Sequence, residues 1–157
     1  MAWYYVLRSS IDLISGLVSF LNKKAKNSST QKRLVIHELR DNLNTMKNGY
    51  KHELSADAIV EALSNAAYRH ALAENYDFNK IRRGELQDFE IKDKRNKRYL
   101  GWTMDRLLEK IDEKIHELKQ LKKMSGGFDN LQHANISLML SNLYFRMKLA
   151  AEFMQSE

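Results

Sequence analysis

The sequence predicts an all-α protein, an antiparallel up-down bundle of four long helices with a shorter helical insert in the middle. Three observations predict this class. The chain contains no proline, whereas an average usage of about 5% would give roughly eight. It contains only six glycines, and both residue types disfavour helix interiors. Apolar residues recur at spacings of three and four along most of the 157 residues, which we expect to form a single domain, residues 1–157.

The first predicted helix covers residues 4 to about 24. It is apolar over most of its circumference, and a helix of this kind must be covered on several sides. We therefore expect it to be the central element around which the later helices pack. Its two apolar seams are Tyr4, Leu7, Ile11, Ile14, Val18 and Leu21, and Trp3, Val6, Leu13, Leu17 and Phe20.

The same helix is not expected to span a membrane or to act as a signal peptide. Arg8 and Asp12 interrupt its apolar run, and a charge near the middle of a spanning helix is costly. Its lysines follow the apolar run, whereas a signal peptide places basic residues before it. Peripheral membrane binding through this N-terminal helix, with aromatic residues at one end and lysines at the other, stays open as an alternative.

Two more helices are predicted in the first half of the chain. After a polar break at residues 27–30, a helix with Ser29 or Thr30 as its N-cap extends to Asn48-Gly49, a pair typical of a left-handed cap. Its apolar seam is Ile36, Leu39, Leu43, Met46 and Tyr50. A third helix opens at Ser55 and continues to about residue 73, and its many alanines favour close packing.

The connection that follows is the least regular part of the sequence. Residues 75–79 read as a turn, and Leu86, Phe89 and Ile91 indicate a short amphipathic helix. Long connections without structure of their own are uncommon unless they are functional or mobile. We expect residues 74–98 to be a basic, less regular connection of this kind, either functional or mobile.

Two long helices complete the chain. A clear seam from Leu100 to Leu121 predicts the first, and the Ser-Gly-Gly at 125–127 ends it. Asp129 is the expected N-cap of the second. The seam of that last helix is Ile136, Leu140, Leu143, Met147, Ala150 and Met154.

The composition of the chain excludes several kinds of chemistry and indicates the charge of its partner. The chain has no cysteine, so disulfides, thiolate catalysis and cysteine-ligated zinc are excluded. This fits a reducing cytosol, and we expect a cytoplasmic protein. The formal net charge is +6 and the pI is near 9.4. A basic chain favours an anionic partner, which includes nucleic acid, an acidic protein or a lipid headgroup surface.

Most of this charge lies in residues 80–98. Eight basic residues face four acidic ones there, so the segment contributes +4. Basic side chains neutralise phosphates, and aromatic rings stack on unpaired bases. The segment therefore predicts a nucleic-acid-binding site, although it also fits a solvated connection followed by two aromatic core residues. The predicted site residues are Lys80, Arg82, Arg83, Lys92, Lys94, Arg95, Lys97 and Arg98, with the aromatic Tyr99 and Trp102.

A second polar cluster lies on one face of the second helix. Arg33, His37 and Asp41 follow one another at spacings of four, which place them on one helical face. An aspartate one turn away can hold an imidazole, and an arginine can steady a phosphate. Arg33-Leu-Val-Ile-His37 resembles the arginine–histidine pair of helical HEPN-type ribonucleases, with three intervening residues where that family has four to six. The resemblance implies metal-independent RNA cleavage by Arg33 and His37, and a solvated, ion-paired face is the other interpretation.

No metal or cofactor site is predicted. Glu113 and His116 form one Glu-x-x-His pair, but a di-iron bundle needs two such pairs and two further carboxylates. The glycines at 126–127 follow a helix rather than a strand, so they do not form a phosphate-binding loop.

These observations favour a non-enzymatic α-helical binding module or the small subunit of a larger assembly. Its basic segment is expected to contact nucleic acid, either RNA or DNA, or an acidic protein. Apolar residues on more than one face of the first and last helices favour a homo-oligomer or a subunit of a hetero-complex. The HEPN-like ribonuclease and the peripheral membrane protein are the alternatives.

Overall fold

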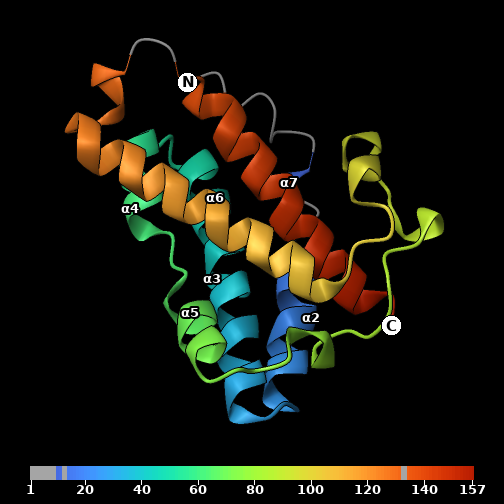
Figure 1. Cartoon of the computed structure of the whole chain (residues 1–157). Helices are drawn as coiled ribbons and strands as arrows, with labels where there is room; N and C mark the ends of the chain where they lie inside the picture. The colour runs from blue at the N-terminus through green and yellow to red at the C-terminus, as the bar shows by residue number, and fades with distance from the viewer. Residues whose placement is uncertain (1–9, 12–13, 132–133) are drawn as a thin grey trace.

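The protein is all-helical, as predicted, in a computed structural model that describes residues 10–11, 14–131 and 134–157 (Figure 1). These residues contain six α-helices and no β-strand, apart from an isolated bridge between Glu85 and Thr103. The finer prediction, an up-down bundle of four long helices, is not confirmed. The helices are α2 (Ile14–Lys26), α3 (Thr30–Lys51), α4 (Ala56–Ala62), α5 (Ala66–Ala73), α6 (Met104–Ser125) and α7 (Ile136–Gln155).

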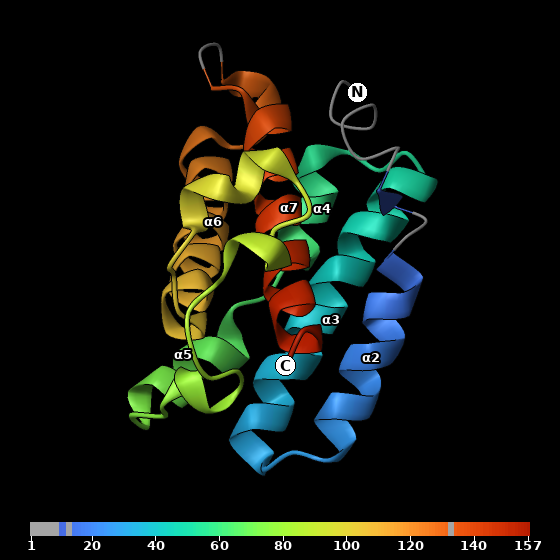
Figure 2. The same ribbon diagram turned by 90° about the vertical axis from the view of Figure 1, so that its right-hand side faces the viewer.

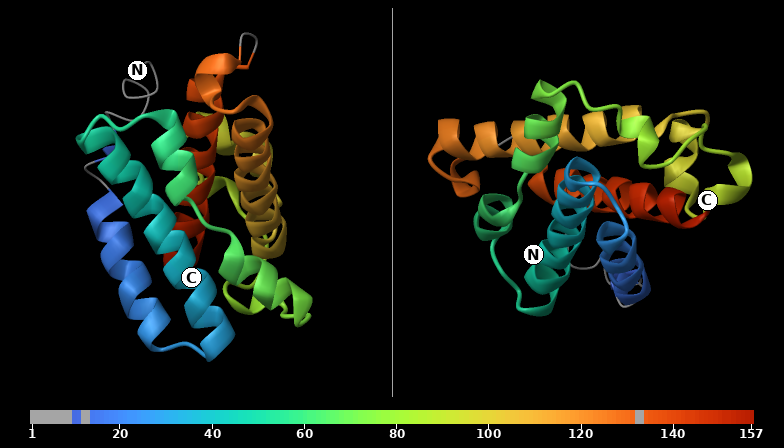
Figure 3. Two further views of the ribbon diagram at one scale, coloured as in Figure 1. Left: turned by 90° about the vertical axis from the view of Figure 1, so that its left-hand side faces the viewer. Right: turned by 90° about the horizontal axis from the view of Figure 1, so that it is seen from below.

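The long helices form three layers. Helices α2 and α3 pair as a hairpin, and α6 lies on the opposite side of the molecule (Figure 2). Helix α7 lies between them and contacts α2, α3 and α6. Seen from below, α6 and α7 run across the direction of the α2–α3 hairpin (Figure 3). The short helices α4 and α5 pack on α3, and α4 also contacts α6.

The central element of the described residues is α7 rather than the N-terminal helix. Thirteen of its 20 residues are buried, whereas α2 buries only Ile14, Leu17, Leu21 and Ala25. The reason is position, because α7 is covered by α6 on one side and by the α2–α3 hairpin on the other. Most of the predicted helix before Ile14, with Tyr4 and Leu7, lies outside the described residues.

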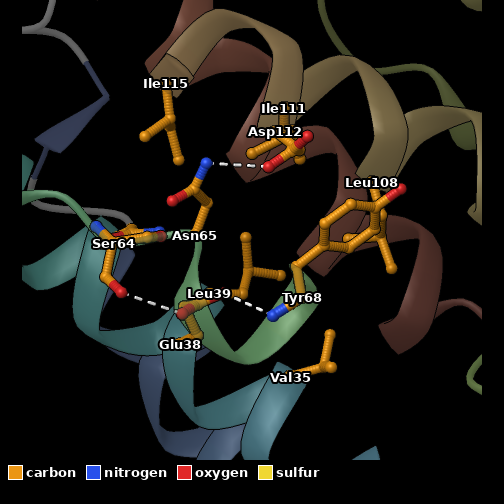
Figure 4. A pocket seen from close by; sticks show the side chains of 11 residues that line it. Val35, Glu38, Leu39, Ser64, Asn65, Tyr68, Leu108, Ile111, Asp112 and Ile115 are labelled. Atoms are coloured by element: carbon orange, nitrogen blue, oxygen red, sulfur yellow. Dashed lines mark hydrogen bonds between the residues drawn. The ribbon is translucent and has the colours of Figure 1, made fainter. Parts of the chain in front are cut away.

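The third predicted helix is broken into α4 and α5 at residues 63–65. Side chains of α3 supply the hydrogen bonds that the break requires (Figure 4). The Asn42 amide accepts from the Ser64 backbone N–H at 2.9 Å and donates to the Ser64 carbonyl at 2.8 Å. The Glu38 carboxylate accepts from the backbone N–H groups of Ala67 and Tyr68 at 2.7 and 3.0 Å, which satisfies the first turn of α5. The break is thus stabilised by residues distant in sequence.

The connection between α5 and α6 contains 3-10 turns instead of the predicted amphipathic helix. These turns are Phe78–Lys80, Asp88–Glu90 and Lys94–Tyr99. Leu86 and Ile91 are buried, as an apolar face requires, but Phe89 is exposed. The Leu86 backbone N–H donates to the Trp102 carbonyl at 2.8 Å, which joins the beginning of the connection to its end.

Helix ends follow the predicted local signals with two exceptions. The predicted left-handed cap at Asn48-Gly49 lies inside α3, which continues to Lys51, and Gly49 does not have a positive φ. Ser29 and Ser55 occupy the predicted N-cap positions, and Gly126 ends α6 in the left-handed conformation, with φ at +75°. The predicted N-cap Asp129 lies instead in a 3-10 turn. Asn135 caps α7, because its side chain accepts from the Leu138 N–H at 3.0 Å.

Candidate nucleic-acid interface

Residues 80–98 form a lobe beside the C-terminal half of α7, and we call it the basic lobe. It is yellow-green to yellow in Figure 1 and lies at one side of the molecule, next to the C-terminus. Its turn Lys94–Tyr99 contacts α7 directly. Side chains of the basic lobe therefore divide between those that hold it to α7 and those that face solvent.

Arg82 holds the basic lobe to the end of α7. Its side chain is 15% exposed and forms an ion pair of 2.8 Å with Glu90, which is buried. It also donates to the Phe153 carbonyl at 2.8 Å, and its guanidinium lies 4.3 Å from the centre of the Phe153 ring. These contacts use the charge and the donors of Arg82, so it is a structural residue and does not face a partner.

Two other cations, Arg95 and Lys92, are exposed, but each also contacts another side chain of the protein. The Arg95 guanidinium lies over the Phe145 ring at 3.9 Å and pairs with Asp93 at 3.1 Å. Lys92 lies 3.6 Å from the largely buried carboxylate of Glu152. Both can reach an external anion only by sharing these partners.

The remaining cations of the basic lobe are exposed. Arg83 lies 3.9 Å from Asp77, and Lys97 lies 3.7 Å from Asp88. Ion pairs on an open surface contribute little, so these two side chains can exchange their partners for phosphates. The exposed basic residues are Lys80, Arg83, Lys92, Lys94, Arg95, Lys97 and Arg98.

The two aromatic residues predicted to stack on bases have other surroundings. Tyr99 is 3% exposed, and its phenol oxygen accepts from the Arg146 guanidinium. Trp102 is half-buried and meets the Tyr99 ring edge-on, with ring centres 4.7 Å apart. The Arg106 guanidinium covers Trp102 at 4.1 Å from its centre. Neither ring offers an open face at the tip of the basic lobe.

Phe89 is the aromatic residue that the basic lobe exposes. Its exposed fraction is 83%, and its sequence neighbour Asp88 pairs with Lys97 at 3.7 Å, so a lysine reaches the turn that carries Phe89. The sequence pattern placed Phe89 on an apolar helix face with Leu86. No local signal separates these two residues, since only the path of the connection buries one and exposes the other.

A hollow of about 470 Å³ lies between the basic lobe, α6 and α7. All four charged residues that line it are basic. Three of them were absent from the predicted site, because they lie on two helices that are far apart in sequence from the basic lobe. We call it the Arg146 hollow, and its lining is Arg98, Tyr99, Trp102, Lys110, Lys114, Met139, Asn142 and Arg146.

The arginine–histidine face of α3 borders a second, open hollow. Arg33 donates to the carbonyls of Ala25 and Ser28 at 3.2 and 3.1 Å, so it binds carbonyls at the end of α2. Asp41 accepts from Arg40 at 2.9 and 3.0 Å. Within the described residues, no hydrogen bond joins Asp41 to His37. Catalysis by Arg33, His37 and Asp41 stays a prediction, without the oriented imidazole that it assumed.

The described residues contain neither a cluster of metal ligands nor a helix that could span a membrane. Among residues 10–11, 14–131 and 134–157, no three His, Asp or Glu side chains gather as metal ligands. Glu113 of the Glu-x-x-His pair lies 3.4 Å from Lys110. No helix in the described part of the chain is long and apolar enough to span a bilayer.

Comparisons of the chain with protein-family models, with curated proteins and with solved structures find no match. The basic lobe and the Arg146 hollow are therefore the features that indicate a function.

Proposed function

We propose that the protein is a non-enzymatic module that binds single-stranded RNA through the basic lobe. The observation that carries this proposal is the exposed Phe89 ring in the same lobe as seven exposed lysines and arginines, one of which, Lys97, pairs with the neighbouring Asp88. A ring of this kind stacks on an unpaired base, while the surrounding cations neutralise the phosphates on either side. The proposal includes a cytoplasmic location and either self-association or a place in a larger assembly.

Single-stranded RNA fits this surface better than a duplex does. An unpaired base has a free face for stacking, whereas bases in an A-form helix are stacked on one another. Four of the exposed basic residues lie in the short turn Lys94–Tyr99 and the other three lie elsewhere in residues 80–92. They do not follow one long helix, which favours a flexible strand. Phe89 replaces Tyr99 and Trp102 as the proposed stacking residue.

The test is the fluorescence anisotropy of a labelled single-stranded RNA, titrated at low and moderate salt. We expect Phe89→Ala to weaken binding by about 1–3 kcal/mol, the usual contribution of one base–aromatic stack. We expect the double variant Lys94→Gln/Lys97→Gln to reduce the slope of log K against log salt by about 1.4, because each phosphate contact on a single strand contributes about 0.7.

Matched controls lie on other parts of the surface. Met124 is 84% exposed on α6, so Met124→Ala removes an equally open apolar side chain. Lys51→Gln/Lys123→Gln removes the same charge from exposed positions on α3 and α6. If these controls weaken RNA binding as much as the lobe variants do, binding is non-specific and the proposal fails.

A denaturing gel of the same samples separates the alternatives. Intact RNA agrees with a binding module. Cleavage that disappears with His37→Ala would instead favour the ribonuclease. Absence of RNA binding together with saturable binding of polyglutamate would replace RNA by an acidic protein as the partner.

A further inference from the structure

Arg146 is a buried arginine without a carboxylate partner among the described residues. It lies in the middle of α7 and is 3% exposed. Its Nε and Nη2 atoms donate to the phenol oxygen of Tyr99 at 2.8 and 2.6 Å. Its Nη1 atom has no hydrogen-bond partner in the described part of the chain. The guanidinium is therefore held in one orientation by a neutral group, with one nitrogen unused.

Burying the Arg146 guanidinium in this way costs folding free energy when no ligand is bound. A buried charge is tolerated when an opposite charge and hydrogen bonds compensate for its lost hydration. The buried carboxylate on the same helix, Glu152, lies instead 3.6 Å from Lys92. Arginine stays protonated at any physiological pH, so Arg146 cannot relieve the cost by losing its proton. An anion from outside the chain would supply the missing charge.

The Arg146 hollow has room and charge for such an anion. Its volume is about 470 Å³, within the usual range of small-molecule sites. Lys110 and Lys114 contribute from successive turns of α6, and Arg98 from the basic lobe. The ion pairs of Lys110 with Glu113 at 3.4 Å and of Lys114 with Glu117 at 3.0 Å lie on the surface, where they are easily exchanged. Within the described residues, no acidic side chain lines the hollow.

We propose that the Arg146 hollow binds the phosphate group of a phosphate ester. The unused Nη1 of Arg146 can donate to a phosphate oxygen, and Arg98, Lys110 and Lys114 add charge around it. Trp102 and Met139 form an apolar wall for the organic part of the ligand. The ester is either a free small molecule or the terminal phosphate of an RNA strand, because Arg98 links the hollow to the basic lobe. The proposal does not depend on RNA binding by Phe89.

Trp102 reports on this site. The chain has two tryptophans, so Trp3→Phe leaves Trp102 as the only indole. In this background, titration with inorganic phosphate at constant ionic strength is expected to change the fluorescence with saturation. Arg146→Met is expected to weaken phosphate binding roughly 10- to 100-fold, since it removes charge-assisted hydrogen bonds.

Two further variants keep the test decisive if Arg146→Met fails to fold. Arg98→Gln/Lys114→Gln alters only residues at the exposed edge of the hollow and should weaken phosphate binding, whereas Lys123→Gln on the same helix α6 should not. Absence of saturable phosphate binding, or equal binding by the parent and by the edge variant, would mean that Arg146 is a structural residue only.

Two versions of one short RNA show whether the phosphate group that binds belongs to a strand end or to a free small molecule. If a 5′-phosphorylated strand binds more tightly than its 5′-hydroxyl version, and Arg98→Gln/Lys114→Gln removes that difference, the ligand is a strand end. Equal binding of both strands, with inorganic phosphate still bound, identifies a free phosphate ester. Failure of Phe89→Ala to affect RNA binding would leave this result unchanged, so the two proposals are separable.

Discussion

The arginines of this protein carry the same charge but make different kinds of contact. Arg82 and Arg33 use their donors on backbone carbonyls and, for Arg82, on a buried carboxylate. Arg146 is buried with an unused nitrogen. Arg83 and Arg98 of the basic lobe are exposed, although Arg83 lies 3.9 Å from Asp77 and Arg98 lies 5.0 Å from the centre of the Tyr99 ring. A net charge of +6 therefore overstates how many cations a partner can meet.

A buried tyrosine predicts how stability depends on alkaline pH. Tyr144 is fully buried, accepts from Ser10 at 3.0 Å, and has its pKa raised by burial from 10.0 to about 12. In the unfolded chain the phenol ionises near pH 10, whereas in the folded state it stays protonated to about pH 12. The stability from this residue is therefore complete below pH 10 and is lost as pH rises to 12.

We expect Tyr144→Phe to flatten this decline by about 2–3 kcal/mol between pH 10 and pH 12. The measurement is the free energy of unfolding by urea at several pH values, for the parent and for Tyr144→Phe. Tyr76, which is only partly buried and whose pKa burial also raises, provides the comparison Tyr76→Phe. Parallel stability curves for the parent and Tyr144→Phe would contradict the prediction.

At the scale of elements, α3 determines where the third helical segment breaks. Asn42 is buried and holds both backbone groups of Ser64. Glu38 and Asn65 extend the network, the latter by donating to Asp112 of α6 at 2.8 Å. The adjoining cavity of about 20 Å³ is large enough for one water molecule, so this site is structural.

Asn42→Ala is expected to destabilise the fold by about 1–3 kcal/mol per backbone group left without a partner. Chemical denaturation followed by circular dichroism measures this loss. Asn48→Ala, at an exposed position on the same helix, is the control and should change stability by less than about 0.5 kcal/mol. Equal effects of the two substitutions would refute the role of Asn42.

The basic lobe depends on Arg82 for its attachment. Arg82→Met leaves Glu90 buried without its ion-pair partner, and breaking such a pair typically costs about 3 kcal/mol. We expect faster hydrogen exchange of the Leu86 and Gly101 amides, whose backbone bonds close the basic lobe at 2.8 and 2.9 Å. Arg83→Met, one residue away and exposed, should leave this exchange unchanged; a similar acceleration there would disprove the assignment.

At the scale of the whole molecule, the basic lobe and the Arg146 hollow meet at Arg98. The basic lobe contacts α7, and α6 supplies the two lysines of the hollow. The two proposed anion-binding surfaces thus adjoin one another at Arg98. A strand that contacted Phe89 and ended in the hollow would use both.

Much of the fold and part of the candidate site follow from local features of the sequence. Absence of proline and the three-four spacing predict the long helices, and Ser29, Ser55 and Gly126 mark three of their ends. These signals are readable because helix propensity, capping and periodicity depend on residues within a few positions of one another. The charge of residues 80–98 is local in the same way.

Which side chains are buried, and which groups they pair with, depends on contacts between segments that are distant in the sequence. Helix α7 became central because three other helices cover it, and α3 determined the break between α4 and α5. Tyr99 is buried and Phe89 exposed because of the path that the connection takes around α7. The Arg146 hollow combines α6, α7 and the basic lobe. Each of these features depends on contacts between residues far apart in the chain, which no local pattern encodes.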